Sequence, residues 1–282
     1  MSESGANMAS QEKHTAQVGK KANENTWSSR GIPPLLVAAW VSYALMVIIN
    51  VSFEALRFGG TTSAEVSNQV FAWFTPAGYA FSIWGLIYVV LGIWMVATTR
   101  SVMKFSKDES PSLSTFTSTN ILNVVWITLF HLRYIEASVA VIIMLLAATG
   151  LLYYSEHRTS AEPMRTIPVS IYFGWISVAS VANVAHLIAR YASFSTPVNE
   201  ISTVIVALAI LVAGYALSRV ENDLVYPLVI IWALVGVGVH LLDVSPMTST
   251  VIFAVTAAGG VLTYAHASGD PLGKIKARIA NV

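Results

Sequence analysis

The sequence predicts an all-α, polytopic transmembrane helical bundle, and three observations support this prediction. First, 55% of the 282 residues are hydrophobic and only 11% are charged, whereas a soluble domain carries about 25% charged residues. Second, the mean hydropathy is +0.64. Third, long apolar stretches recur along the whole chain at helical length. The absence of cysteine excludes disulfides, thiolate catalysis and cysteine-bound metals.

The apolar stretches predict eight membrane spans. About 20 apolar residues cross a bilayer as a helix, and by that measure the spans are 33–56, 76–99, 113–131, 135–154, 166–190, 200–218, 225–243 and 247–267. The third span is the most polar. The connections are short except for 57–75 and 100–112, so we expect one compact bundle rather than separate domains.

The two ends of the chain are polar. Residues 1–32 lack apolar periodicity, which is typical of a disordered tail, and residues 269–282 read as a basic C-terminal tail. No short apolar segment with a cleavage site precedes the first span, so we expect an uncleaved anchor. An organelle transit peptide is the alternative, and the two glutamates of the tail argue against it.

The distribution of positive charge predicts the orientation. With eight spans, one side of the membrane receives 13 of the 16 Lys and Arg residues, and the other side receives only Arg57, Arg133 and Arg190. Cytoplasmic loops are enriched in Lys and Arg, so both termini are predicted in the cytoplasm or the equivalent compartment. The long 57–75 connection is then external, where it is either a binding lid or a passive surface loop.

The second span carries an unusual stripe. Pro76 is typical of a helix start, and the residues at three- and four-residue spacing are Phe81, Trp84, Gly85, Tyr88 and Gly92. Such a spacing places them on one face of the helix. A membrane helix needs no aromatic stripe to contact lipid, so this face is expected to turn inward, toward a partner helix or a ligand.

Two further spans carry stripes of the same kind. These contain Asn120, Asn123, Trp126 and Phe130 in the third span, and Tyr172, Trp175, Ala179, Asn183 and His186 in the fifth. Bare amides are costly in hydrocarbon, so Asn123 and Asn183 should face the interior. They serve either as inter-helix contacts or as polar elements of a mainly aromatic ligand pocket. At 1.5 Å per residue, Trp84, Asn123 and Asn183 lie about 10–12 Å below the external helix ends, in one layer.

Several function classes lose support. No lysine lies between Lys107 and Lys274, so a retinal Schiff base inside the bundle is excluded. Carboxylates are expected only at span edges, at Glu54, Glu136 and Asp243, which argues against ion-coupled transport but not against facilitated transport. No hydrolase or nucleotide-binding motif is present, and neither catalytic residues nor a metal site are predicted.

Three histidines, His131, His186 and His240, lie near external span ends. Histidine is a common haem ligand, and the alternative is a solvated histidine at the membrane surface.

At the three stripes the sequence resembles the TspO/MBR family of tryptophan-rich sensory and translocator proteins. The matching positions are Thr75, Pro76, Phe81, Trp84, Tyr88 and Gly92 in the second span, Leu122, Asn123, Trp126 and Phe130 in the third, and Tyr172, Trp175, Ala179 and Asn183 in the fifth. The resemblance covers roughly 33–190. Ala77 replaces the second proline of the family's double-proline step, and Arg190 precedes Tyr191, so the proposed sterol motif is not kept.

The resemblance implies a five-helix core at 33–190, with additional transmembrane helices at 191–268. It implies a pocket for a tetrapyrrole, protoporphyrin IX or haem, as a ligand rather than a required cofactor, closed by the loop between the first two helices. The expected ligand-binding residues are Phe81, Trp84, Tyr88, Asn123, Trp126, Tyr172, Trp175 and Asn183.

The resemblance leaves several functions open. It implies a membrane protein of a bacterial inner membrane or an organelle, with the lipid bilayer and a hydrophobic small molecule as partners and no nucleic acid. It allows a homodimer. Weak light-dependent porphyrin breakdown, with Trp84 and Trp175 as candidates, would make the protein an enzyme. The alternatives are a transporter of a small hydrophobic metabolite and a purely structural membrane protein.

Overall fold

The computed structural model describes residues 32–105 and 108–269, and every regular element among them is helical. The long helices are α2 (Pro34–Ala55), α4 (Ile83–Phe105), α5 (Ser110–His131), α6 (Ile135–Thr159), α7 (Pro163–Tyr191), α8 (Thr196–Glu221), α9 (Val225–His240) and α10 (Pro246–Ala267). Three short elements join α2 to α4, namely η1 (Phe58–Gly60), α3 (Ser63–Ser67) and η2 (Gly78–Ser82). The predicted all-α bundle is confirmed. The predicted polar tails lie almost wholly outside the described residues.

Not all of the eight expected spans have the length of a membrane crossing. Seven helices are long and apolar enough to cross a membrane, and α9 is shorter. Its 16 residues rise about 24 Å, whereas the hydrocarbon core is about 30 Å thick. The predicted span 225–243 is too long because the chain leaves the helix after His240 and makes a turn over 241–244.

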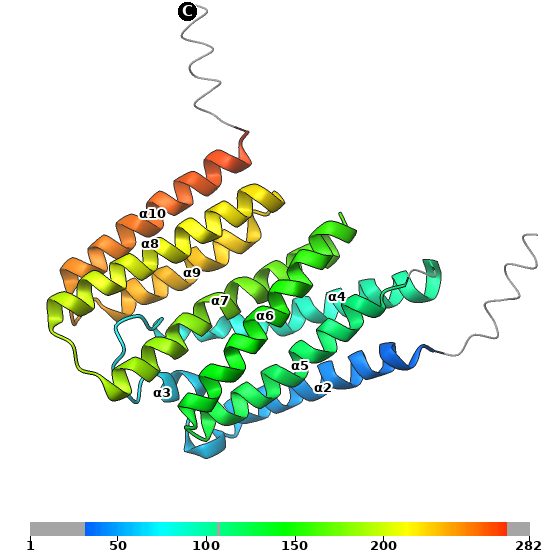
Figure 1. Cartoon of the computed structure of the whole chain (residues 1–282), viewed down its shortest axis with the longest axis horizontal. Helices are drawn as coiled ribbons and strands as arrows, with labels where there is room; N and C mark the ends of the chain where they lie inside the picture. Colours follow the sequence, from blue (N-terminus) through cyan, green and yellow to red (C-terminus); the bar gives the residue numbers. More distant parts are fainter. Residues whose placement is uncertain (1–31, 106–107, 270–282) are drawn as a thin grey trace, which may run out of the picture.

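The helices form two layers (Figure 1). In the first layer, α5 packs between α2 and α6, α6 packs on α7, and α7 packs on α4. The second layer contains α8, α9 and α10, which pack on one another, and α9 attaches this layer to α7 and η2. The first and last described helix ends, at Pro34 and Ala267, lie at the same end of the bundle.

The start of the second span differs from the prediction. Pro76 does not begin an α-helix, because residues 78–82 form a 3₁₀ turn and the α-helix begins at Ile83. The N–H of Ala77 donates instead to the carbonyl of Gly236 in α9, at 2.9 Å. The segment before α4 is therefore held by a hydrogen bond to the second layer rather than by a hydrogen bond within an α-helix.

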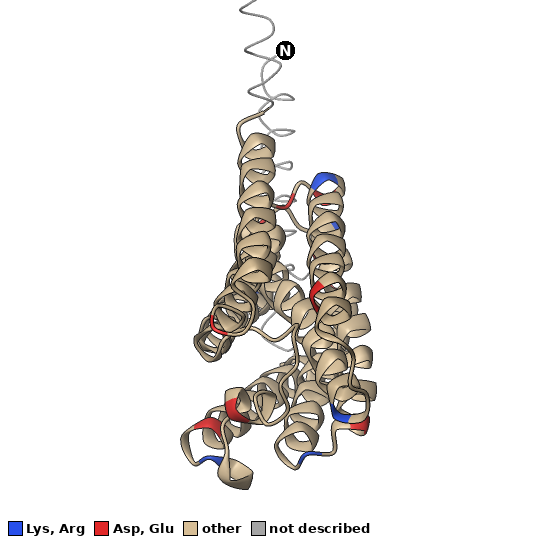
Figure 2. Ribbon diagram, turned by 90° about the vertical axis from the view of Figure 1, so that its left-hand side faces the viewer, with Lys and Arg blue, Asp and Glu red and all other residues tan. Residues whose placement is uncertain are grey.

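Lys, Arg, Asp and Glu residues are few, and the basic ones lie toward the two ends of the bundle (Figure 2). A cluster of charged side chains is nevertheless buried. The Arg165 side chain, 4% exposed, donates to both oxygens of Glu109 at 2.5 and 2.7 Å and to both oxygens of Glu156 at 2.8 and 2.9 Å. This cluster ties together α5, α6 and α7 at the end opposite α3.

Carboxylates beyond those named from the sequence are also buried, and they too lie at helix ends. Glu156 is fully buried within α6, and Asp223, also buried, accepts a hydrogen bond from the Tyr153 hydroxyl at 3.0 Å. Both carboxylates lie at the helix ends opposite α3, where hydrogen-bonding partners replace water.

Candidate functional site

The three predicted stripes meet inside the first layer. The ring of Trp84, from α4, lies 5.8 Å from the ring of Trp126 in α5 and 6.3 Å from that of Trp175 in α7. Phe81 packs edge-on against Trp175 at 5.8 Å. Aromatic rings at such distances attract one another beyond the burial of their area. The aromatic stripes therefore form one shared wall rather than three separate contacts.

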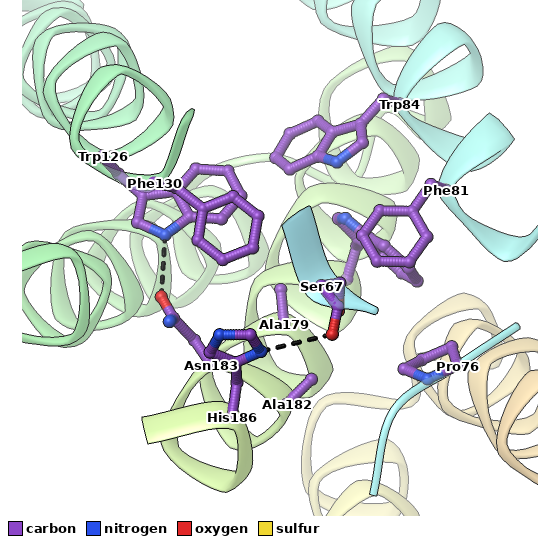
Figure 3. Close-up of a pocket in the computed structure, with 11 residues that line it drawn as sticks. Ser67, Pro76, Phe81, Trp84, Trp126, Phe130, Ala179, Ala182, Asn183 and His186 are labelled. Carbon is purple, nitrogen blue, oxygen red and sulfur yellow. Dashed lines mark hydrogen bonds between the residues drawn. The ribbon is translucent and has the colours of Figure 1, made fainter. Parts of the chain in front are cut away.

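A small cavity lies within this wall (Figure 3). Its lining comprises Ser67, Pro76, Phe81, Trp84, Trp126, Phe130, Trp175, Ala179, Ala182, Asn183 and His186. Figure 3 shows Trp84 and Phe81 facing Trp126 and Phe130 across the cavity, with Asn183 and His186 on a third side. The lining thus comes from α4, α5 and α7, completed by the segment between α2 and α4.

The structure brings five of the eight predicted binding residues to this cavity: Phe81, Trp84, Trp126, Trp175 and Asn183. The other three pack beside it. Tyr88 stacks on Trp84 at 5.9 Å. Asn123 accepts a hydrogen bond from Asn50 at 2.9 Å and donates to the Tyr172 hydroxyl at 3.4 Å. Asn123 and Tyr172 therefore form a polar contact that joins α2, α5 and α7.

Six further residues line the cavity: Ser67, Pro76, Phe130, Ala179, Ala182 and His186. Ala182 belongs to none of the predicted stripes, although it follows Ala179 at a helical spacing of three residues, and the sequence indicated Pro76 only as a helix start. Phe130, Ala179 and His186 belong to the predicted stripes, so helical spacing already indicated them. Ser67 belongs to α3, and no helical period can place a residue of a connecting segment next to a cavity.

The cavity is small. Its volume is about 20 Å³, which is room for about one water molecule. Small-molecule sites have volumes of about 300–1,000 Å³. A ligand of tetrapyrrole size can therefore enter only if the lining side chains or the covering segment move.

Two buried N–H groups at the cavity have no partner among the described residues. Asn183 is 4% exposed, and its Oδ1 accepts from Trp126 Nε1 at 3.0 Å and from Ser138 Oγ at 3.2 Å. Its Nδ2 has no acceptor, and neither has Nε1 of Trp175, which is 1% exposed. A buried donor without a partner costs about 1–3 kcal/mol. Both N–H groups are therefore available to a hydrogen-bond acceptor on a ligand.

The connection between α2 and α4 covers this end of the bundle and is held by three histidines. His131 Nδ1 lies 3.0 Å from the Phe58 carbonyl oxygen, and its Nε2 lies 3.1 Å from Ser63 Oγ. His186 Nδ1 donates to the Ser67 carbonyl at 3.2 Å, as Figure 3 shows. The His240 ring stacks on Phe71 at 5.0 Å. Each histidine thus contacts a different point of the connection, and the three do not face a common centre.

The connection also carries its own helical turn. The Thr62 hydroxyl accepts from the Glu65 N–H at 3.2 Å, and the Glu65 carboxylate accepts from the Thr62 N–H at 3.0 Å. This capping box and the Arg57 guanidinium hold the pKa of Glu65 below its usual value. The covering segment is therefore a folded element with fixed contacts.

A comparison with known protein families gives one match. The sequence profile of a family described as TSPO-like protein matches residues 36–266. The match extends beyond residue 190, so it includes α8, α9 and α10 together with the five helices of the first layer. No curated protein and no solved structure matches the chain.

Proposed function

The chain belongs to the TSPO-like protein family and is a multi-pass integral membrane protein, and we propose that it binds a tetrapyrrole or a similar planar hydrophobic molecule between α4, α5 and α7. The observation that carries this proposal is the pair of unmatched donors, Trp175 Nε1 and Asn183 Nδ2, in an otherwise aromatic cavity. The rings of Trp84 and Trp175 offer stacking surfaces, and the carboxylates of a porphyrin are the acceptors that the two donors lack.

Binding requires the cavity to open. Ser67 and Pro76 line it from the covering segment, and that segment is held by hydrogen bonds rather than by a covalent link. We propose that the ligand displaces this segment and separates the aromatic rings.

Titration of the purified protein with protoporphyrin IX and with haem tests the proposal. The chain has eight tryptophans, so saturable quenching of tryptophan fluorescence, with a shifted Soret band, is the expected result. Trp175→Phe keeps a ring but removes the Nε1 donor. We expect it to weaken binding about tenfold, the equivalent of about 1.4 kcal/mol.

Trp94→Phe is the matched control, because Trp94 is buried in α4 but does not line the cavity. It should leave the affinity unchanged. Quenching that never saturates, or equal affinity of the Trp175→Phe and Trp94→Phe variants, would contradict the proposed site.

A further inference from the structure

A second and larger cavity lies between the two layers, in a crevice that we call the α7–α8 crevice. Its volume is about 490 Å³, within the range of small-molecule sites. Its lining comprises Phe71, Trp73, Phe74, Val181, Val184, Ala185, Ile188, Ala189, Ala192, Ser193, Phe194, Val198, Asn199, Ser202, Thr203 and Val206. In the second layer, α8 packs on α9 and α10, and it is α9 that packs on α7. The crevice is the space left between α7 and α8.

The crevice has the depth of half a bilayer. On α7 it extends inward from Ala192, just past the helix end, to Val181, and on α8 it extends inward from Val198 to Val206. At 1.5 Å per residue, the α7 side covers about 15 Å, whereas the hydrocarbon core is about 30 Å thick. In a membrane, the crevice therefore runs from the surface on the α3 side to about the middle of the bilayer.

Its polarity changes along this depth. Ser193, Asn199 and Ser202 lie toward the surface end, whereas Val181, Val184 and Val206 lie at the deep end. Thr203 lies between them, and its hydroxyl donates to the Asn199 carbonyl at 2.8 Å. No Lys, Arg, Asp or Glu lines it. A molecule that fits this gradient has an uncharged polar group at one end and an apolar tail, because a charged group would find no opposite charge in the crevice.

The crevice and the aromatic cavity share two walls. Along α7, Val181 and Ala185 face the crevice, whereas Ala182 and His186 face the cavity. Along the covering segment, Phe71 and the two aromatics after it line the crevice, while Ser67 and Pro76 line the cavity. The two sites are therefore adjacent but separately lined.

We propose that the α7–α8 crevice is a second binding site, which takes a single-chain lipid with an uncharged, hydroxyl-bearing head group. The head group lies at Asn199 and Ser202, and the chain lies against Val181 and Val206. The lipid bilayer is the source of this occupant, because the apolar lining residues Ile188, Phe194 and Val198 are exposed on the outside of the bundle. The proposal does not depend on tetrapyrrole binding, because the two sites share no lining residue.

Photolabelling in reconstituted bilayers tests the proposal. The probe is a monoacylglycerol with a photoreactive group in its acyl chain, and mass spectrometry of the labelled peptides locates it. We expect saturable labelling of 181–192 and 198–206 that an excess of unlabelled monoacylglycerol removes. A fatty acid carrying the same photoreactive group, which is anionic, should label these segments at least tenfold less.

Variants that fill the crevice provide the structural control. Ala185→Phe and Ala189→Phe, made separately in case one fails to fold, should each reduce the labelling at least tenfold. Ala213→Phe places the same ring on an exposed part of α8 outside the crevice and should leave the labelling unchanged. Circular dichroism and gel filtration establish that each variant is folded.

Three results would overturn the proposal. Unsaturable labelling spread over all lipid-facing helices would show ordinary bilayer contact only. Equal labelling by the fatty acid would show that the head group is not selected. Loss of the label on addition of protoporphyrin IX, while Ala189→Phe also abolishes tryptophan quenching, would assign the crevice to the tetrapyrrole instead. A failure of porphyrin binding alone would leave the lipid labelling unaffected.

Discussion

Arg165 shows how a single buried charge organises one end of the bundle. Its guanidinium makes four hydrogen bonds to Glu109 and Glu156, and the two carboxylates also accept from Ser101 and Ser112, each at 2.7 Å. Removing charges from water is costly, and only such complete pairing offsets the cost. Loss of one partner leaves the others buried without compensation.

We therefore predict that Arg165→Met destabilises the protein by about 3–5 kcal/mol, because it leaves two buried carboxylates unpaired. Thermal unfolding in detergent, followed by circular dichroism, measures the loss. The matched control is Arg158→Met, since Arg158 is 57% exposed in its pair with Glu221 and such pairs contribute about 1 kcal/mol or less. Equal shifts in the two variants would refute a special role for the buried cluster.

Asn123 and Asn183, two of the three asparagines of the predicted stripes, are expected to have different roles. Asn123 joins helices through Asn50 and Tyr172 but does not line the cavity. We predict that Asn123→Leu lowers stability by about 1–3 kcal/mol and leaves the affinity for protoporphyrin IX unchanged. Asn183→Leu, by contrast, should lower the affinity as well. If both variants changed the affinity alike, the polar contact at Asn123 would belong to the site.

At the residue scale, helical spacing predicted which side chains meet but not which of them reach the cavity. Trp84 and Tyr88 lie on one stripe of α4, yet only Trp84 lines the cavity. The difference depends on how far each helix is rotated and how deeply its neighbours extend. The rotation and depth of each helix are set by the packing of the whole bundle. They cannot be predicted from the residue spacing on one helix.

Among the elements of the second layer, α9 makes the most extensive contact with the first layer, and it does so in part through a close backbone approach. A Cβ atom on Gly236 would lie 3.0 Å from the Cβ of Pro76 and 3.1 Å from that of Ala80. The same glycine accepts the hydrogen bond from Ala77. Glycine at this position therefore allows α9 to hold the start of the second span.

We predict that Gly236→Val separates α9 from η2 and destabilises the protein by about 1–3 kcal/mol, because the added side chain overpacks the contact. Unfolding in detergent measures the change. Gly260→Ala is the control, since a Cβ at Gly260 meets nothing within 4 Å, and alanine in a helix should be neutral or stabilising by up to about 1 kcal/mol. An unchanged unfolding midpoint for Gly236→Val would mean that the contact is dispensable.

The sequence predicted the existence of the elements better than their ends. The length of each apolar stretch was enough to predict the membrane helices, because a chain that crosses the hydrocarbon core must satisfy its backbone hydrogen bonds within a helix. The α-helical start at Ile83 rather than Pro76 could not be foreseen, since it depends on a hydrogen bond to a residue in α9, more than 150 positions later in the chain.

For the whole molecule, the common end of Pro34 and Ala267 agrees with an even number of antiparallel helices (Figure 1). The charge distribution then predicts that this end faces the cytoplasm. The natural chain has no cysteine, so single cysteines can report the sidedness without background.

We expect that a membrane-impermeant maleimide added to intact cells or sealed vesicles labels Asn68→Cys, an exposed position at the end of α3. Ala161→Cys, an exposed position between α6 and α7, should react only after the membrane is opened. The reverse pattern would invert the orientation, and reaction of both positions from one side would contradict the crossing count.

The short helix α9 has one more consequence, which concerns the surrounding membrane. Its residues Leu228, Trp232 and Val239 are exposed, so lipid meets a wall of about 24 Å there, while the neighbouring α7 has 29 residues. Hydrophobic mismatch costs fractions of a kcal/mol per Å. The apolar belt of this protein is therefore uneven around its circumference, and short-chain lipids should gather beside α9 and thin the bilayer on that flank alone.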